Sequence, residues 1–213
     1  MRRSNRARLH VGPGSPCDLV ADSRTITEVA RSKPLPGVAL RGNLIPMSPG
    51  LPLDHLTVRP ATVADAAALG ACHNACWRQA YRGLLSPELL AAQDDAARAD
   101  GWRRALSDSI GQTVVVAEMG DRMVGLAAAG MTNDEQPVRD LELHALYVLR
   151  SVYGTGVGQR LFDAAVGTGR CSLWVAAANA RAIGFYRRQG FRPDGAHKRI
   201  EEWEGLPIIR MLR

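Results

Sequence analysis

The sequence predicts a single α/β domain, and three observations support this prediction. Two β-type runs, residues 113–118 and 123–130, are joined by Gly120-Asp121, a dipeptide typical of hairpin turns. A strand, a helix and a second strand follow within residues 141–176, and this order predicts a right-handed crossover between parallel strands. The chain has 213 residues and 46% hydrophobic content, which is enough for one sizeable core.

Organised sequence begins with a short strand at residues 55–60, which Pro60 closes because proline has no backbone N–H for the sheet. Thr62 and Asp65 have the spacing of a capping box, so a helix is expected to begin there. Apolar residues then recur every three or four positions until about Gly83, which indicates one buried helix face.

A second helical run begins at Ser86-Pro87, because serine caps a helix and proline is tolerated in its first turn. We expect this run to break near Gly101 and to end near Leu106. The elements after the hairpin are a strand at 141–149, a helix at about 156–166, a strand at 170–176, a helix at 179–189 and two final strands at 191–196 and about 203–211.

Residues 1–54 are predicted to form a disordered or loosely ordered N-terminal extension, and residues 55–213 the folded domain. Prolines are frequent among Gly, Ser and Arg in the extension, and no apolar periodicity is present. Two other interpretations are a targeting peptide and a true start at Met47. Residues 1–56 carry +4 of the formal charge of +6, so the domain is close to balanced and no nucleic-acid partner is expected.

Cysteine usage and hydropathy narrow the expected environment. The four cysteines lack the regular spacing of a disulfide framework, which fits a reducing cytoplasm. Cys72-His73-Asn74-Ala75-Cys76 has no second ligand couplet elsewhere, so we interpret it as a packed helix face and expect no metal site. No stretch free of charged residues exceeds 12 residues, whereas a membrane helix needs about 20, so no membrane partner is expected.

The most informative stretch runs from Leu146 to Leu161, where a predicted strand leads into a glycine-rich turn and then a helix. Such a junction directs unpaired backbone N–H groups and the positive end of a helix at one point, which favours an anion such as phosphate. Gly154, Gly156 and Gly158 do not match a dinucleotide fingerprint, and the P-loop Lys-Ser or Lys-Thr is missing. Taken alone, the loop is either a tight structural turn or a phosphate cradle.

Two motifs together make the loop more specific. Tyr153-Gly-Thr-Gly-Val-Gly resembles the acetyl-CoA pyrophosphate loop of the GNAT superfamily of N-acetyltransferases, and Asn179-Ala-Arg-Ala-Ile-Gly-Phe-Tyr resembles the segment that follows it there. The likeness covers about residues 56–213. Tyr153 departs from the pattern, because the superfamily has Arg or Gln at this position; Arg150 or Arg160 is the candidate to compensate.

The resemblance implies a GNAT-like α/β fold, in which a mixed, mostly antiparallel sheet of six or seven strands is flanked by about four helices. A parallel strand pair splays at the cofactor site. It also implies an N-acetyltransferase that moves the acetyl group of acetyl-CoA to a primary amine by direct attack in a ternary complex. Homodimers are common in the superfamily, so a homodimer is a possible assembly. The alternatives are a non-catalytic module that binds or senses acyl-CoA, and a nucleotide-binding or nucleic-acid-associated protein.

The resemblance also assigns acetyl-CoA to particular residues. Its pantetheine arm is expected to pair with the backbone of residues 146–148, and its pyrophosphate to lie in the glycine loop. Asn179 is expected to contact the arm and also to cap the following helix. The expected cofactor-binding residues are Leu146, Tyr147, Val148, Tyr153, Gly154, Thr155, Gly156, Val157, Gly158, Gln159, Asn179 and Tyr186.

Acetyl transfer to an amine needs a base and an acid. A lysine-like amine has a pKa of about 10.4, so its deprotonation at pH 7 costs about 4.6 kcal/mol, part of which a general base offsets. The resemblance assigns Glu142 as the base and Tyr186 as the acid that protonates the departing thiolate. Strand alternation predicts that Glu142 and His144 share a face with Leu146 and Val148. The other interpretations are a salt-bridged or solvated Glu142 and a packed His144.

Large aromatic side chains are candidates for the acceptor pocket, because the first helices and the C-terminal hairpin flank that pocket in the superfamily. Trp77, Tyr81, Trp102 and Trp203 are expected either to line it or to pack in the core. The arginines of the helix at 179–189 are interpreted as solvated helix charges or as cofactor contacts.

Overall fold

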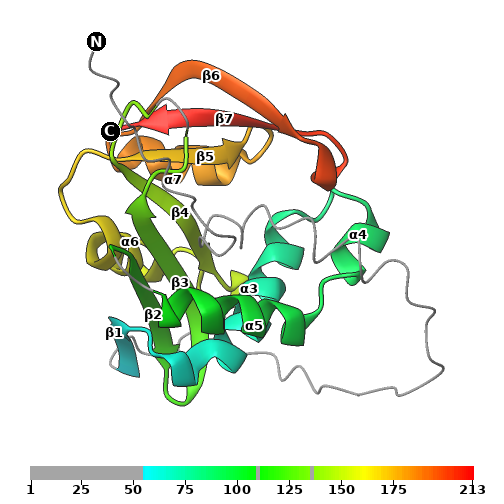
Figure 1. The fold of residues 1–213 in the computed structure, drawn as a ribbon, viewed down its shortest axis with the longest axis vertical. Helices are drawn as coiled ribbons and strands as arrows, with labels where there is room; N and C mark the ends of the chain where they lie inside the picture. Colours follow the sequence, from blue (N-terminus) through cyan, green and yellow to red (C-terminus); the bar gives the residue numbers. More distant parts are fainter. Residues whose placement is uncertain (1–54, 109–110, 135–136) are drawn as a thin grey trace, which may run out of the picture.

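The computed structural model describes residues 55–108, 111–134 and 137–213, so the predicted extension at 1–54 lies outside the described residues. Seven strands form one sheet in the order β1-β2-β3-β4-β5-β7-β6 (Figure 1). The strands are β1 (Leu56–Pro60), β2 (Thr113–Met119), β3 (Arg122–Met131), β4 (Leu141–Val148), β5 (Ser172–Ala176), β6 (Arg192–Ile200) and β7 (Leu206–Leu212). The helices are α3 (Ala66–Ala80), α4 (Pro87–Ala91), α5 (Asp95–Ser107), α6 (Val157–Val166) and α7 (Ala180–Arg188). The predicted mixed fold is confirmed.

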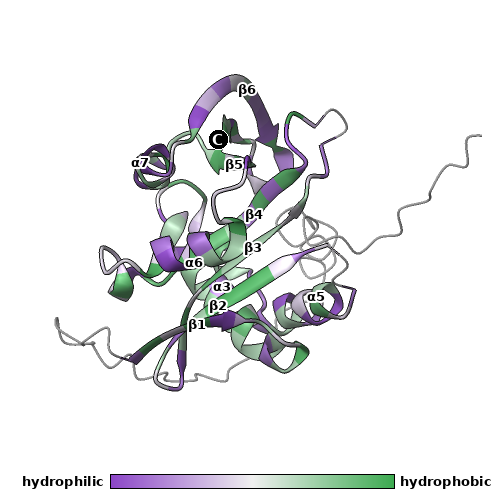
Figure 2. Ribbon diagram, turned by 90° about the vertical axis from the view of Figure 1, so that its left-hand side faces the viewer, coloured by the Kyte–Doolittle hydropathy of each residue, from purple (hydrophilic) through white to green (hydrophobic). Residues whose placement is uncertain are grey.

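The first four strands form an antiparallel meander that carries most of the core. Gly120 takes a φ of 56° in the tight turn between β2 and β3, as the hairpin prediction requires. Both strands are buried along most of their length, with Val116 and Leu126 fully inaccessible to solvent. Helix α6 packs on one side of this meander and α3 on the other, with α5 packed against α3 (Figure 2).

The N-terminal helices pack through a close backbone approach at Gly70. A Cβ there would lie 2.6 Å from the carbonyl oxygen of Asp95 and 2.7 Å from the nitrogen of Ala99, so only glycine fits. The predicted helix break near Gly101 is wrong, because α5 runs through this buried residue without interruption. The break lies earlier, where the Asp94 carboxylate accepts hydrogen bonds from two backbone N–H groups of α5.

The predicted capping pair at the start of α3 is present. The Asp65 carboxylate accepts hydrogen bonds from the Thr62 backbone N–H at 2.7 Å and from the Thr62 hydroxyl at 2.9 Å. Arg59 of β1 forms ion pairs with Asp65 and with Glu118 of β2, and this network joins the first strand to the helix that follows. The network holds the pKa of Asp65 well below its usual range, chiefly through the Arg59 hydrogen bond.

The fold divides where β4 meets β5. These two strands are parallel, as predicted, but only Glu142 and Ser172 are paired across them, so the strands part beyond their first residues. Beyond β5, the strands β7 and β6 continue the sheet in antiparallel order, and Figure 1 shows these three strands as a group set apart from the meander. The unpaired length of β4 leaves backbone groups available at the centre of the molecule.

A β-bulge in β4 changes which side chains share a face. Glu142 is paired with Gly130 of β3, and Ala145 is paired with Ala128. Since Gly130 and Ala128 are two positions apart, Glu142 and Ala145 face the same side of the sheet. His144 is the inserted residue between the two pairs.

The expected shared face of Glu142, Leu146 and Val148 is therefore wrong. One extra residue shifts the alternation of a strand by one, so every side chain after the bulge points opposite to the simple period-two pattern. Tyr147 consequently shares the face of Glu142, while Leu146 and Val148 face the other side. Nothing in the local sequence signals a bulge.

Candidate active site

A cavity of about 770 Å³ occupies the gap between β4 and β5. Its walls come from the end of α3, the second half of β4, the glycine loop before α6, β5, α7 and the strands β6 and β7. The splayed strands position the cavity, because a fully paired sheet would leave no opening there. Among the described residues, none of the helices combines the length and apolar composition that a membrane span requires.

The glycine loop forms one end of the cavity with exposed backbone. Gly154 and Gly156 take φ angles of 78° and 88°, which side chains rarely adopt, and the position of a Cβ at either glycine is open space. The backbone N–H groups of Gly154 and of residues 156–159 donate no hydrogen bond to any group in the part of the chain that the structure describes. These N–H groups and the start of α6 fit an anionic group such as a diphosphate.

Most predicted cofactor-binding residues meet in this cavity. Leu146, Tyr147, Val148, Tyr153, Gly154, Gly156, Gly158, Gln159, Asn179 and Tyr186 all line it. Thr155 and Val157 do not: the Thr155 hydroxyl donates to the Val152 carbonyl at 2.7 Å, and the Val157 side chain is buried in the core. Asn179 also accepts a hydrogen bond from the Ala182 N–H at 3.0 Å, which confirms its capping role.

A cation stacks on Tyr153, the residue that departs from the superfamily pattern. The guanidinium carbon of Arg181 lies 3.0 Å from the centroid of the Tyr153 ring, and both residues line the cavity beside the glycine loop. Arg150 lines the cavity too, whereas Arg160 does not. From the sequence, Arg181 was considered only together with the other arginines of this helix. Its position two residues after Asn179 puts it in the first turn of the helix that faces the loop.

Tyr186 is buried against the cavity on α7. Its ring packs against Phe185 and Phe191, with centroids 5.4 Å and 5.8 Å away. Burial, reinforced by the neighbouring Tyr81, raises the pKa of Tyr186 well above its ordinary value. The hydroxyl therefore remains protonated at neutral pH, as a proton donor must.

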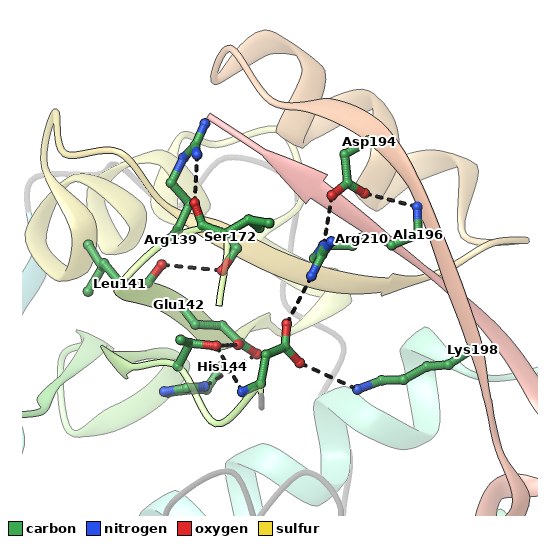
Figure 3. Close-up of polar contacts among 12 residues, drawn as sticks. Arg139, Leu141, Glu142, His144, Ser172, Asp194, Ala196, Lys198 and Arg210 are labelled. Atoms are coloured by element: carbon green, nitrogen blue, oxygen red, sulfur yellow. Dashed lines mark hydrogen bonds and ion pairs between the residues drawn. The ribbon is translucent and has the colours of Figure 1, made fainter. Parts of the chain in front are cut away.

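Glu142 does not line the cavity, although His144 beside it does. The Glu142 carboxylate accepts a hydrogen bond from the Thr132 hydroxyl at 2.6 Å, and its Oε1 lies 3.6 Å from Nδ1 of His144 (Figure 3). Burial acts to raise the pKa of Glu142, but hydrogen bonds with His144 and Thr132 outweigh it and hold the pKa below its usual value. The carboxylate is therefore ionised at neutral pH and one side chain away from the cavity.

Aromatic side chains form the opposite end of the cavity. Tyr81 and Trp203 line it, while Trp77 packs behind both with ring centroids 5.1 Å and 5.5 Å away. Trp102 lies instead in the main core, 5.7 Å from the ring of His73. Trp174 of β5 also lines the cavity and was missed from the sequence, because only the splay of the strands turns it toward open space.

The described residues contain no group of three or more His, Cys, Asp or Glu side chains that could hold a metal ion. Cys72 and Cys76 are buried free thiols on α3, as their interpretation as a packed helix face expected. Cys76 reaches the wall of the cavity.

Comparison with known proteins agrees with this geometry. Residues 75–191 match the sequence model of the acetyltransferase (GNAT) family, which is more than half of the chain. The chain belongs to the GNAT acetyltransferase family. It is 30% identical over 164 residues to a probable N-acetyltransferase of Mycobacterium tuberculosis, an alignment that covers 74% of this chain and 90% of the relative.

Solved GNAT-family structures share the fold. The PaiA N-acetyltransferase of Thermoplasma acidophilum, in complex with coenzyme A, has a TM-score of 0.55 at 15% identity and covers 73% of this chain and 97% of its own. The YncA acetyltransferase of Salmonella typhimurium, solved with acetyl-CoA, has a TM-score of 0.53 at 21% identity, with 74% and 92% covered. This GNAT protein is therefore an acetyl-CoA-dependent N-acetyltransferase.

Proposed function

We propose that this GNAT protein transfers the acetyl group of acetyl-CoA to a primary amine by direct attack within a ternary complex, with residues 55–213 as the catalytic unit. The observation that carries the proposal is the cavity between the splayed strands, which joins the free amides of the glycine loop to the hydroxyl-bearing Tyr186. The amine and the thioester would meet in the middle of this cavity.

The cofactor end of the cavity suits coenzyme A. The amides of residues 154 and 156–159 would bind its pyrophosphate, and the unpaired edge of β4 at 146–148 would bind its pantetheine arm as an added strand. In place of the Arg or Gln expected at position 153, Arg181 would supply a side-chain contact to a phosphate. Because stacking on Tyr153 already restricts the Arg181 side chain, it would lose less conformational entropy when it binds the phosphate.

The amine must lose a proton as its nitrogen attacks the thioester carbonyl carbon. We propose that the His144 ring, which lines the cavity, accepts this proton. Glu142 beside it stabilises the charge that the ring gains. The ionised state of Glu142 supports this role, because a negative carboxylate attracts the positive charge that the ring gains when it takes the proton.

The transfer is completed when the carbon–sulfur bond breaks and the thiolate takes a proton. Tyr186 is the proposed donor, since its hydroxyl is protonated at neutral pH and lies at the cavity wall, where it can donate a hydrogen bond and then a proton to the departing sulfur. The proton gained by the His144 ring is released to water, water returns a proton to the Tyr186 phenolate, and the acetylated amine and coenzyme A leave.

The test combines calorimetry of acetyl-CoA binding with an assay of CoA release against a panel of primary amines. Gly158→Asp would add a carboxylate next to the free amides, whereas Gly169→Asp adds the same charge outside the cavity; a Cβ at either site meets only ordinary contacts, 3.8 Å and 3.6 Å away. We expect Gly158→Asp to weaken acetyl-CoA binding by on the order of 100-fold through phosphate repulsion and Gly169→Asp to leave it unchanged.

Two results would contradict the proposal. If the wild-type protein does not bind acetyl-CoA, or if both aspartate variants bind it equally well, the glycine loop is not the pyrophosphate site. Tight binding without CoA release from any amine would favour the non-catalytic sensor alternative.

A further inference from the structure

The end of the cavity away from the glycine loop has an apolar and aromatic wall, which we call the acceptor wall. It is formed by Tyr81, Tyr147, Trp174, Ile200, Trp203 and Ile208. Tyr81 and Trp203 meet edge to face, with ring centroids 5.5 Å apart, so this part of the wall is preformed rather than loosely packed. Among the described residues that line the cavity, none is an aspartate or a glutamate.

Two carboxylates beside the Trp174 side of the acceptor wall already have partners. Asp134 forms an ion pair with Arg210 at 3.2 Å and lies 4.0 Å from Lys198, and Asp194 pairs with Arg210 at 2.8 Å. Figure 3 shows Arg210 reaching from β7 toward Asp194 and Lys198 reaching in from β6. A second positive charge on an acceptor would therefore have to displace Lys198 or Arg210 to pair with either of these two carboxylates.

Both of these cations, Lys198 and Arg210, also lie over the Trp174 ring of the wall. Lys198 Nζ is 4.1 Å from the centroid of the Trp174 ring, and the guanidinium carbon of Arg210 is 5.5 Å away. The ring is thus already engaged by positive charge, which disfavours binding of a further ammonium group at this place.

One amine can still be held where the wall meets the thioester site. The hydroxyl oxygens of Tyr81 and Tyr147 lie 3.5 Å apart on neighbouring walls of the cavity. Burial raises the pKa of both side chains, so both are neutral phenols whose oxygens can accept hydrogen bonds from an amine N–H.

We propose that the acceptor is a primary amine carried on an uncharged apolar body, such as an arylalkylamine or an alkylamine, and not a polyamine or an aminoglycoside. The acceptor wall would cover the apolar body, and the two tyrosine hydroxyls would hold the nitrogen. This inference rests on the proposed function and specifies its substrate class. An apolar wall also favours the neutral form of the bound amine, because burial penalises the ammonium ion, and the neutral form is the one that attacks.

The test compares two amines that differ only in a distal charge. CoA release is measured with hexylamine and with 1,6-diaminohexane, and we expect kcat/KM to be on the order of tenfold higher for hexylamine because the second ammonium would be buried without a partner. 2-Phenylethylamine should match or exceed hexylamine. A tripeptide amide that begins with phenylalanine presents a similar apolar body on a peptide N-terminus. Comparison of its kcat/KM with that of 2-phenylethylamine distinguishes a peptide acceptor from a small amine.

A binding measurement separates this inference from the proposed function. Calorimetry of both six-carbon amines with the protein saturated with CoA reports acceptor selectivity even when no acetyl group is transferred. Tighter binding of hexylamine supports the inference, whether or not turnover is seen. Equal or tighter binding of the diamine, equal or faster turnover of the diamine, or no binding of either amine overturns it.

A variant pair tests the acceptor wall directly. Ile200→Glu adds a carboxylate to the wall, while His197→Glu adds one to an exposed site on the same strand that does not line the cavity. We expect Ile200→Glu to shift the ratio of the two kcat/KM values toward the diamine by on the order of tenfold. His197→Glu should leave the ratio unchanged; an equal shift in both variants would show that bulk charge, and not the wall, sets the preference.

Discussion

The two ends of the cavity recognise ligands by different means. The glycine loop offers backbone N–H groups whose direction is fixed by the left-handed glycines and by the start of α6. The acceptor wall offers only side chains, drawn from the end of α3, from β4, β5, β6 and β7, and from the segment between β6 and β7. Backbone contacts change little when side chains are substituted, so the loop suits a constant ligand, while the wall is open to change and suits a substrate that differs between relatives.

The two ends also differ in how their charges are used. At the loop end, Arg181 is exposed and stacks on Tyr153, with no ion pair recorded for it among the described residues. Near the acceptor wall, Arg210 and Lys198 are engaged with Asp134. The loop end thus keeps positive charge available for an anion, and the wall end does not.

The largest effect is expected where the two ends meet, at Tyr186. Tyr186→Phe removes the proposed proton donor and keeps the ring that packs against Phe185 and Phe191. We expect kcat to fall about 100-fold, with little change in the KM for acetyl-CoA. Steady-state kinetics measure this, and Tyr153→Phe serves as a control at the loop end. A loss of melting temperature equal to the loss of activity would point to packing instead.

A smaller loss is expected for Glu142→Gln, which acts one side chain away from the cavity. The amide keeps an oxygen for the Thr132 hydroxyl but cannot stabilise a protonated His144 ring. We expect kcat to fall on the order of tenfold, as for other residues that act through a catalytic neighbour. Exposed Glu88→Gln is the matched control, and an unchanged kcat in Glu142→Gln would remove this residue from the mechanism.

The same variant has a separate signature in stability. The pKa of Glu142 is lowered in the folded protein relative to about 4.3 in an unfolded chain, so its ionised form stabilises the fold above that pH and this contribution is lost as pH falls through the lowered pKa. Chemical denaturation should find Glu142→Gln less stable than wild type by about 1 kcal/mol at pH 7. The difference should disappear in acid, and a difference that is constant with pH would contradict the ionised state.

The smallest effect is expected at the loop end, because many backbone amides share the phosphate contact. Arg181→Ala should raise the KM for acetyl-CoA about fivefold and leave kcat unchanged, since the lost contact would be the same in the ground and transition states. Arg187→Ala, an exposed arginine of the same helix outside the cavity, is the control. If both substitutions raise KM equally, general positive charge on α7 is responsible, and not the Arg181 and Tyr153 stack.

Local patterns in the sequence were sufficient for most elements. The Gly120 hairpin turn, the Asp65 cap and the Asn179 cap were predicted because each depends on contacts within a few residues. The helix break was misplaced at Gly101, because an isolated glycine is tolerated in a helix when tertiary packing covers it, and Asp94 provides the stronger local signal.

The sequence by itself determined the family, the parallel crossover and the loop that suits a diphosphate, since these follow from glycines and helix ends whose geometry is local. The tertiary structure decided the position of the His144 bulge, the stacking of Arg181 on Tyr153 and the selection of Trp174 and Trp203 for the acceptor wall. Each of these depends on how strands far apart in the chain pair or separate. Such pairing is set by the summed packing of the whole sheet, and no short stretch of sequence encodes it.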